Sequence, residues 1–208
     1  MSQPQLPCPG SGRVPRVLVV YGTTEGQTRS VACRIAELAH AAGAEAEFVH
    51  SAEAGSCLEQ GWDGVIVGAS VHQGHHQTAV RRFVLANLPR LRGLHGAFFS
   101  LSLSAAAPDP ARRDEALGYT EAFLAETGWR PDVTLSLGGA LRGAEHGPYE
   151  QLVLSMLGYQ LGGGTVGPRD ADYTDWGLVE AFVQRFLASL AQLPKTPQAA
   201  PAPAAPPW

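Results

Sequence analysis

The segment best suited to chemistry is residues 19–28, VVYGTTEGQT, where an apolar run passes into a polar loop. Three threonines and two glycines lie in it: Gly22, Thr23, Thr24, Gly26 and Thr28. Threonine hydroxyls and the unpaired N–H groups of a helix N-terminus can together bind a phosphate. A strand, loop and helix of this composition therefore predict a phosphate site, and a capping turn without a ligand is the alternative.

The loop differs from two common nucleotide-binding motifs. It has no lysine for a G-x-x-x-x-G-K-[ST] loop, and Gly22 and Gly26 do not fit G-x-G-x-x-G. A nucleoside triphosphate is therefore disfavoured, and a site without a cation favours a monophosphate held by neutral donors. Glu25 is expected to point outward, because its carboxylate would repel the phosphate.

Three histidines form the densest group of titratable side chains: His72, His75 and His76. No cysteine or acidic residue lies in the same stretch to complete a metal site, so no metal is predicted. Two alternatives remain for these side chains. They are exposed polar loop residues, or they contact a ligand or substrate.

The elements that position these residues predict an α/β protein with a doubly wound parallel sheet. Apolar, β-branched runs alternate with segments of helical spacing, which is typical of a parallel sheet covered on both faces. The predicted strands are Arg16–Tyr21, Ala44–Val49, Gly64–Ala69, Gly96–Leu103 and Asp132–Ala140. The predicted helices run from Thr28 to Ala42 and over His76–Leu88, Pro110–Thr127 and Asp175–Leu193, the last with Thr174 as its N-cap.

One domain is expected over residues 16–193. It contains an insertion at 141–171, between the fifth strand and the final helix, which is longer than a routine connection. An apolar helical face is predicted inside it at Tyr149–Leu161. Residues 1–15 and 194–208 are rich in proline and are predicted to be disordered extensions.

Composition excludes several classes of protein. The chain has 15 Lys and Arg against 19 Asp and Glu, a net charge of −4, and 45% hydrophobic residues, which describes an ordinary globular protein and not a nucleic-acid-binding one. Its apolar runs have the length of strands, so no membrane-spanning helix is predicted. Three widely spaced cysteines and the lack of a secretory signal favour reduced thiols and a cytoplasmic location, with at most peripheral membrane contact.

The pattern Thr-x-x-Gly-x-Thr at Thr23–Thr28 resembles the FMN-phosphate loop of flavodoxin-like proteins. Further segments resemble the menaquinone-dependent protoporphyrinogen oxidases of bacterial haem synthesis: VIVGASVHQGHH at 65–76, AFFSLSLSAAAPDP at 97–110, WRPD at 129–132, GGALR at 138–142 and YTDW at 173–176. The resemblance implies a flavodoxin-like five-stranded sheet in the order 2-1-3-4-5. FMN is then expected at the carboxyl ends of the strands.

The resemblance also implies which residues contact the cofactor. The phosphate is expected at Thr23, Thr24, Glu25, Gly26, Gln27 and Thr28. The ring is expected between the loops that follow the third and fourth strands, with contacts from Ala69, Ser70, Val71, His72, Gly74, Ser100, Ser102, Leu103 and Ser104. Because FMN accepts hydride at N5, no catalytic side chain is expected.

The implied reaction is oxidation of protoporphyrinogen IX to protoporphyrin IX with menaquinone or another quinone as the acceptor. The implied substrate contacts are His75, Arg142 and Tyr149. The insertion has few basic residues, so its attraction to an anionic membrane is expected to be weak, and a helix docked on its own domain is an equal alternative. The alternative function is a flavodoxin-type electron carrier or another quinone-linked flavoprotein.

Deletion of residues 1–15 and 194–208 tests the expected domain bounds. Proline-rich, weakly charged ends contribute little to a packed core, so the truncated chain should keep the melting temperature and flavin content of the full chain. Thermal denaturation and flavin absorbance measure both properties. A large drop in melting temperature after removal of either end would show that this end docks on the domain.

Overall fold

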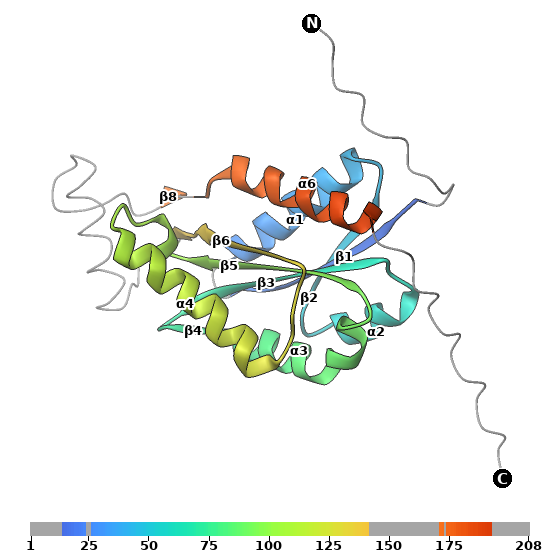
Figure 1. Ribbon diagram of the computed structural model, residues 1–208, viewed down its shortest axis with the longest axis horizontal. Coiled ribbons are helices and arrows are strands. Elements are labelled where there is room, and N and C mark those ends of the chain that lie inside the picture. The colour runs from blue at the N-terminus through green and yellow to red at the C-terminus, as the bar shows by residue number, and fades with distance from the viewer. Residues whose placement is uncertain (1–13, 24–25, 142–170, 173, 193–208) are drawn as a thin grey trace, which may run out of the picture.

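The computed structural model describes residues 14–23, 26–141, 171–172 and 174–192. Its centre is a sheet of five parallel strands in the order β2-β1-β3-β5-β6 (Figure 1). These strands are β1 (Arg16–Gly22), β2 (Glu45–His50), β3 (Gly64–His72), β5 (His95–Ser102) and β6 (Val133–Gly138). Counted along the chain, this is the 2-1-3-4-5 order of the flavodoxin-like fold, so the predicted fold class is confirmed.

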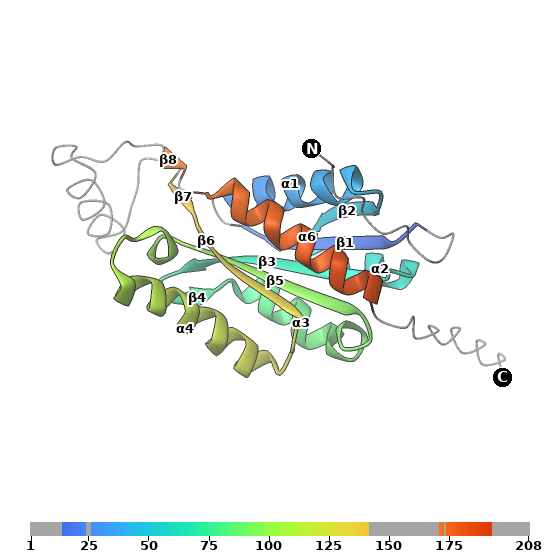
Figure 2. The same ribbon diagram turned by 45° about the horizontal axis from the view of Figure 1, so that its top comes forward.

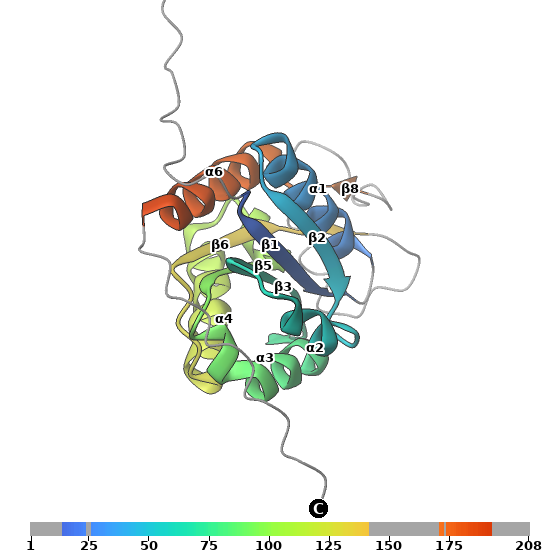
Figure 3. The same ribbon diagram turned by 90° about the vertical axis from the view of Figure 1, so that its right-hand side faces the viewer.

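Helices cover both faces of the sheet (Figures 1 and 2). Helices α1 (Gln27–Ala41) and α6 (Trp176–Gln192) lie on one face. Helices α3 (Thr78–Leu91) and α4 (Pro110–Thr127) lie on the other, together with the short α2 (Ala54–Cys57). Figure 3 shows the sheet between these layers from one side.

Strand β1 shows why helices cover both faces of the sheet. Its side chains alternate between the faces, and four successive valine and leucine residues are fully buried. Val17 and Val19 pack in the α1 and α6 layer, whereas Leu18 and Val20 pack in the layer of α2, α3 and α4. A strand buried on both faces needs this continuous apolar pattern, which is the pattern that predicted it.

Three short strands were not predicted. Strand β4 (His75–His76) joins the main sheet, where it pairs antiparallel with the end of β3. Strands β7 (Ala140–Leu141) and β8 (Ala171–Asp172) pair antiparallel and form a separate two-stranded sheet. The prediction of a loop from Ala69 to Gly74 was therefore wrong. β3 continues to His72 and turns back through Gln73 and Gly74, whose φ angles of 50° and 81° suit a tight two-residue hairpin turn.

The start of α6 also differs from the prediction. Asp175, not Thr174, caps this helix, because Asp175 Oδ1 accepts hydrogen bonds from the N–H groups of Gly177 and Leu178 at 2.9 and 3.1 Å. Thr174 is instead buried. Its hydroxyl contacts Gln27 and Gly138, which places it beside the candidate site described below.

Three expectations concern residues outside the described part of the chain. They are most of the N-terminal extension, the helix at Tyr149–Leu161 and the C-terminal tail at 194–208. Within the described part, no helix has the length and apolar character needed to cross a bilayer.

Gly68 tests the packing at the centre of the sheet. A Cβ at this position in β3 would overlap the ring of Phe99, which is fully buried on the neighbouring strand β5 and has no room to move. Gly68→Ala should therefore lower the free energy of unfolding by about 2 kcal/mol. The matched control is Gly118→Ala on α4, where an added Cβ has no neighbour within 4 Å and a helical alanine should stabilise by roughly 0.5–1 kcal/mol.

Denaturant unfolding of the two variants measures the comparison. Equal effects of Gly68→Ala and Gly118→Ala would contradict the packing described here.

Candidate functional site

The candidate site lies at the edge of the sheet where the parallel strands end. The register pairs Gly22 at the end of β1 with Ala69 on β3, and Ala69 with Ser100 on β5. Farther along, Ser102 pairs with Gly138 at the end of β6. The loop after β1, the β3–β4 hairpin and the turn after β5 consequently meet at one edge, which is where open α/β sheets bind ligands.

The loop after β1 is shaped by Gly26 and Thr23. Gly26 has a φ of 87°, a left-handed conformation that favours glycine, and its N–H donates to Thr23 Oγ1 at 2.7 Å. No described side chain caps α1, which begins at the next residue. The first N–H groups of a helix lack partners within the helix, so this end attracts an anion.

Thr28 adds a hydroxyl to this helix end. The residue is fully buried, and no described group forms a hydrogen bond with its Oγ1. A buried hydroxyl without a partner is costly, because folding removes its hydrogen bonds to water. A phosphate at the start of α1 would supply the missing acceptor, so the residues present fit the terminal phosphate of FMN.

The other predicted phosphate contacts divide into two groups. Thr24 and Glu25 lie outside the described residues. Gln27 is buried, and its Nε2 donates to Thr174 Oγ1 at 2.8 Å. Its amide is thus bound to a residue that follows the predicted insertion in the sequence.

The β3–β4 hairpin forms the second part of the site. Ala69 is fully buried, and Ser70 accepts a hydrogen bond from Gln77 Nε2 at 2.9 Å. Val71 pairs with His76, while His72 and His75 pair with each other and have exposed side chains. Gly74 forms the turn.

The described residues contain no cluster of His, Cys, Asp or Glu that could hold a metal ion. Of the three histidines, His76 has a different role from the other two. Its Nε2 lies 2.8 Å from Ser100 Oγ, and its ring centroid lies 5.4 Å from that of Phe98 and 4.9 Å from that of Phe123. Burial, and then the neighbouring His75, lower the pKa of His76 to about 4, so the ring is neutral at neutral pH.

From the sequence alone, His76 was expected to be an exposed loop residue or a ligand contact, and the resemblance implied that Ser100 contacts the ring. The Ser100 hydroxyl is engaged with His76, so these two residues together anchor the hairpin to β5. The signal that was missed is the two-residue Gln-Gly turn between Val71-His72 and His75-His76, which is typical of a hairpin.

The turn after β5 forms the third part of the site. It is a single 3₁₀ turn at Ser104–Ala106. Ser102 Oγ accepts from the N–H of Ala105 at 3.2 Å, which closes the turn on the strand, and Leu103 is half-buried between the two serines. Ser104 Oγ donates to Glu115 on α4 at 3.1 Å.

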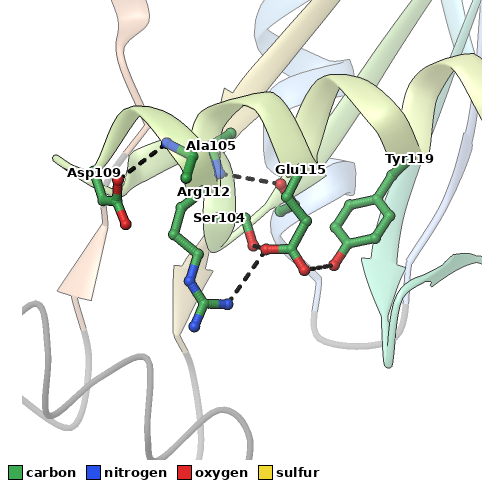
Figure 4. A network of polar contacts seen from close by, with 8 residues as sticks. Ser104, Ala105, Asp109, Arg112, Glu115 and Tyr119 are labelled. Carbon is green, nitrogen blue, oxygen red and sulfur yellow. Dashed lines mark hydrogen bonds and ion pairs between the residues drawn. The ribbon is translucent and has the colours of Figure 1, made fainter.

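Glu115 is the centre of a polar network beside this turn (Figure 4). Its Oε1 accepts from the Tyr119 hydroxyl at 2.6 Å, and its Oε2 accepts from Ser104 and, at 3.3 Å, from Arg112 Nη1. The hydrogen bond from Tyr119, with further contributions from Ser104 and Arg112, lowers the pKa of Glu115 against the opposing effect of partial burial. The network therefore holds a carboxylate at neutral pH.

The same network reaches the hairpin. A Cβ at Gly74 would lie 3.7 Å from Tyr119 Cε1, so the tyrosine ring lies against the hairpin turn while its hydroxyl binds Glu115. Helix α4 thus supports both segments that are expected to flank a flavin ring. The remaining predicted substrate contacts, Arg142 and Tyr149, lie outside the described residues.

The comparisons with known proteins agree on one family. A model of the flavodoxin domain matches residues 18–165. The protoporphyrinogen IX dehydrogenase (quinone) of Escherichia coli strain K12 is 30% identical over 179 residues, which cover 86% of this chain and 98% of that protein. A protein of the same name from Leishmania major is 28% identical over 186 residues, which cover 89% of this chain and 80% of that one.

Solved structures with a similar fold include two flavodoxins. Oxidised Flavodoxin 2 from Bacillus cereus is 19% identical, covers 84% of this chain and 99% of its own, and superposes with a TM-score of 0.51. A short-chain flavodoxin associated with a bacterial microcompartment is 11% identical, covers 85% of this chain and 99% of its own, and gives a TM-score of 0.52. At these identities the likeness concerns the fold alone.

Replacement of Thr28 by valine separates ligand binding from folding. The substitution keeps the shape and removes the buried hydroxyl, so the apoprotein should gain about 1 kcal/mol in unfolding free energy while FMN binds about tenfold more weakly. Denaturant unfolding and titration of FMN fluorescence measure the two effects. The control is Thr134→Val at an exposed position of β6, which should change neither, and wild-type FMN affinity in Thr28→Val would place the phosphate elsewhere.

Glu115→Gln tests the network through its pH dependence. Because the folded-state pKa of Glu115 is lowered, its carboxylate stabilises the fold above the ordinary glutamate pKa, and this contribution is lost as the pH falls through the lowered value. The difference in melting temperature between wild type and Glu115→Gln should therefore be largest near neutral pH and vanish in acid. Glu121→Gln, exposed on the same helix, is the control, and a difference independent of pH would contradict the network.

Proposed function

The chain belongs to the flavodoxin domain family, and on that basis we propose that it is an FMN-dependent oxidoreductase that converts protoporphyrinogen IX to protoporphyrin IX. We infer a menaquinone-type quinone as the electron acceptor and a place in haem synthesis. The relatives from Escherichia coli and Leishmania major are named for this substrate and for a quinone, which supports both parts of the proposal.

The observation that carries the cofactor site is the buried Thr28 hydroxyl at the uncapped start of α1. In this proposal the N–H groups of the first turn and the hydroxyls of Thr23 and Thr28 hold the FMN phosphate. Thr24 and Glu25, which lie outside the described residues, are the further phosphate contacts in this proposal. When bound, FMN supplies hydride acceptance at N5, so the protein needs no acid–base pair for the redox step.

The two segments supported by α4 orient the ring. Ser70 and Val71 on one side and Leu103 on the other are half-buried and would contact a flat heterocycle in this proposal. Ala69 and Ser102 are buried and support the two segments. Ser104 acts through Glu115, which fixes the turn. Ser100 acts through His76, which fixes the hairpin.

We propose that the substrate enters beside the exposed edge of the hairpin. His72 and His75 are exposed there, and Arg142 and Tyr149 from the insertion are the further contacts in this proposal. We place the protein in the cytoplasm, in peripheral contact with the membrane that carries its quinone, and without a nucleic-acid partner.

Turnover with defined substrates tests the proposed function. A catalytic amount of the FMN-loaded full chain, mixed anaerobically with excess protoporphyrinogen IX, should form protoporphyrin continuously only when a soluble menaquinone analogue is present to reoxidise the flavin. Thr134→Val loaded with FMN to the same occupancy is the matched control, and it should turn over at the wild-type rate because Thr134 is exposed near the start of β6, away from the strand ends that form the candidate site. An FMN-loaded wild type that forms no protoporphyrin would favour a flavodoxin-type electron carrier.

A further inference from the structure

We propose that Gln27 and Thr174 act as a pair of positioning residues that hold the first turn of α1 ready for the FMN phosphate. The inference rests on the proposed cofactor site. It changes the expected role of Gln27 from a direct ligand to a residue that acts through the backbone, and it gives a role to the YTDW segment at 173–176, which the proposed reaction leaves unused.

The hydrogen bond between these two side chains joins distant parts of the chain. Gln27 Nε2 donates to Thr174 Oγ1 at 2.8 Å across 147 residues of sequence. Both residues are buried, with exposed fractions of 5% and 9%. Breaking a hydrogen bond between buried neutral groups costs free energy, because water cannot replace either partner.

Thr174 has a defined orientation. Its hydroxyl donates to the carbonyl oxygen of Gly138 at the end of β6, at 3.4 Å, so its oxygen accepts from Gln27. The next residue, Asp175, caps α6 and fixes the backbone that carries Thr174. Gln27 is therefore bound to Thr174, which is itself held by the end of β6 and the start of α6.

Thr174 connects to the other parts of the site. Gly139, which follows the carbonyl that binds Thr174, donates its N–H to the carbonyl of Ser102 at 3.2 Å. The start of α1 is thus linked through Thr174 and residues 138–139 to the turn after β5. This continuous set of hydrogen bonds fixes the phosphate-binding turn relative to a segment that flanks the ring.

The direction of the Gln27 side chain explains how it can act on the phosphate. Gln27 is the first residue of α1, next to Thr28, whose hydroxyl is buried at the same helix end. With an amide N–H directed to Thr174, Gln27 would meet the anion through its backbone in the first turn. Loss of the pair should therefore weaken recognition of the phosphate specifically.

A comparison of FMN with riboflavin, which lacks the phosphate, tests the proposal on the full chain. The variants are Gln27→Ala, Thr174→Val, their double mutant, and Thr174→Ser as the control that keeps the hydroxyl. Fluorescence titration should show FMN binding weakened about five- to tenfold in each single variant, and no further in the double mutant. Riboflavin affinity should be unchanged throughout, and Thr174→Ser should bind FMN as the wild type does.

Other outcomes overturn the proposal. Equal weakening of FMN and riboflavin would mean that the pair only stabilises the fold, and additive effects in the double mutant would mean that the two side chains act separately. Unchanged FMN affinity, or a wild type that binds no FMN, would also contradict it. A wild type that binds FMN but does not oxidise protoporphyrinogen would contradict the proposed reaction alone and leave this result standing.

Discussion

The unsatisfied N-terminus of α1 is the constraint on which the rest of the site depends. Strand β1 is buried on both faces, so the helix that follows it must start at the sheet edge, beside the ends of β3 and β5. That start has no described side-chain cap, and it buries the Thr28 hydroxyl without a partner. An anion would satisfy both deficits, so the arrangement of these residues supports the proposed phosphate site.

Helix α4 holds the two segments that are proposed to flank the ring. It binds the turn after β5 through Glu115 and Ser104, and it contacts the hairpin through Tyr119 and Phe123. Ala69, Ser100 and Ser102 at the strand ends are buried. FMN supplies the redox chemistry, and the protein supplies its binding site.

Much of this arrangement could be predicted from local sequence pattern. The strand at 16–22 contains the apolar run Val17–Tyr21, so the fold was predictable. The Thr-x-x-Gly-x-Thr loop follows it directly, and the phosphate site at this loop stays a prediction. The resemblance to flavodoxin-like proteins is confirmed by the family match.

The features that the sequence analysis missed depend on contacts between distant residues. Thr174 precedes a helix, and threonine is a common N-cap residue. Its hydroxyl instead binds the buried partners Gln27 and Gly138, and Asp175 caps the helix in its place. His76 was grouped with two exposed histidines, although it packs on Phe98 and Phe123. No spacing rule within a single segment predicts such pairs.

The most direct test of the central claim is the reduction of the bound flavin by the porphyrinogen in the absence of oxygen and quinone. FMN-loaded protein is supplied in at least threefold molar excess over protoporphyrinogen IX, because full oxidation removes six electrons and each FMN accepts two. On mixing in a stopped-flow instrument, it should lose the visible absorbance of oxidised flavin as protoporphyrin fluorescence appears. A menaquinone analogue added afterwards should restore the absorbance. Flavin that stays fully oxidised in the presence of protoporphyrinogen would contradict the account.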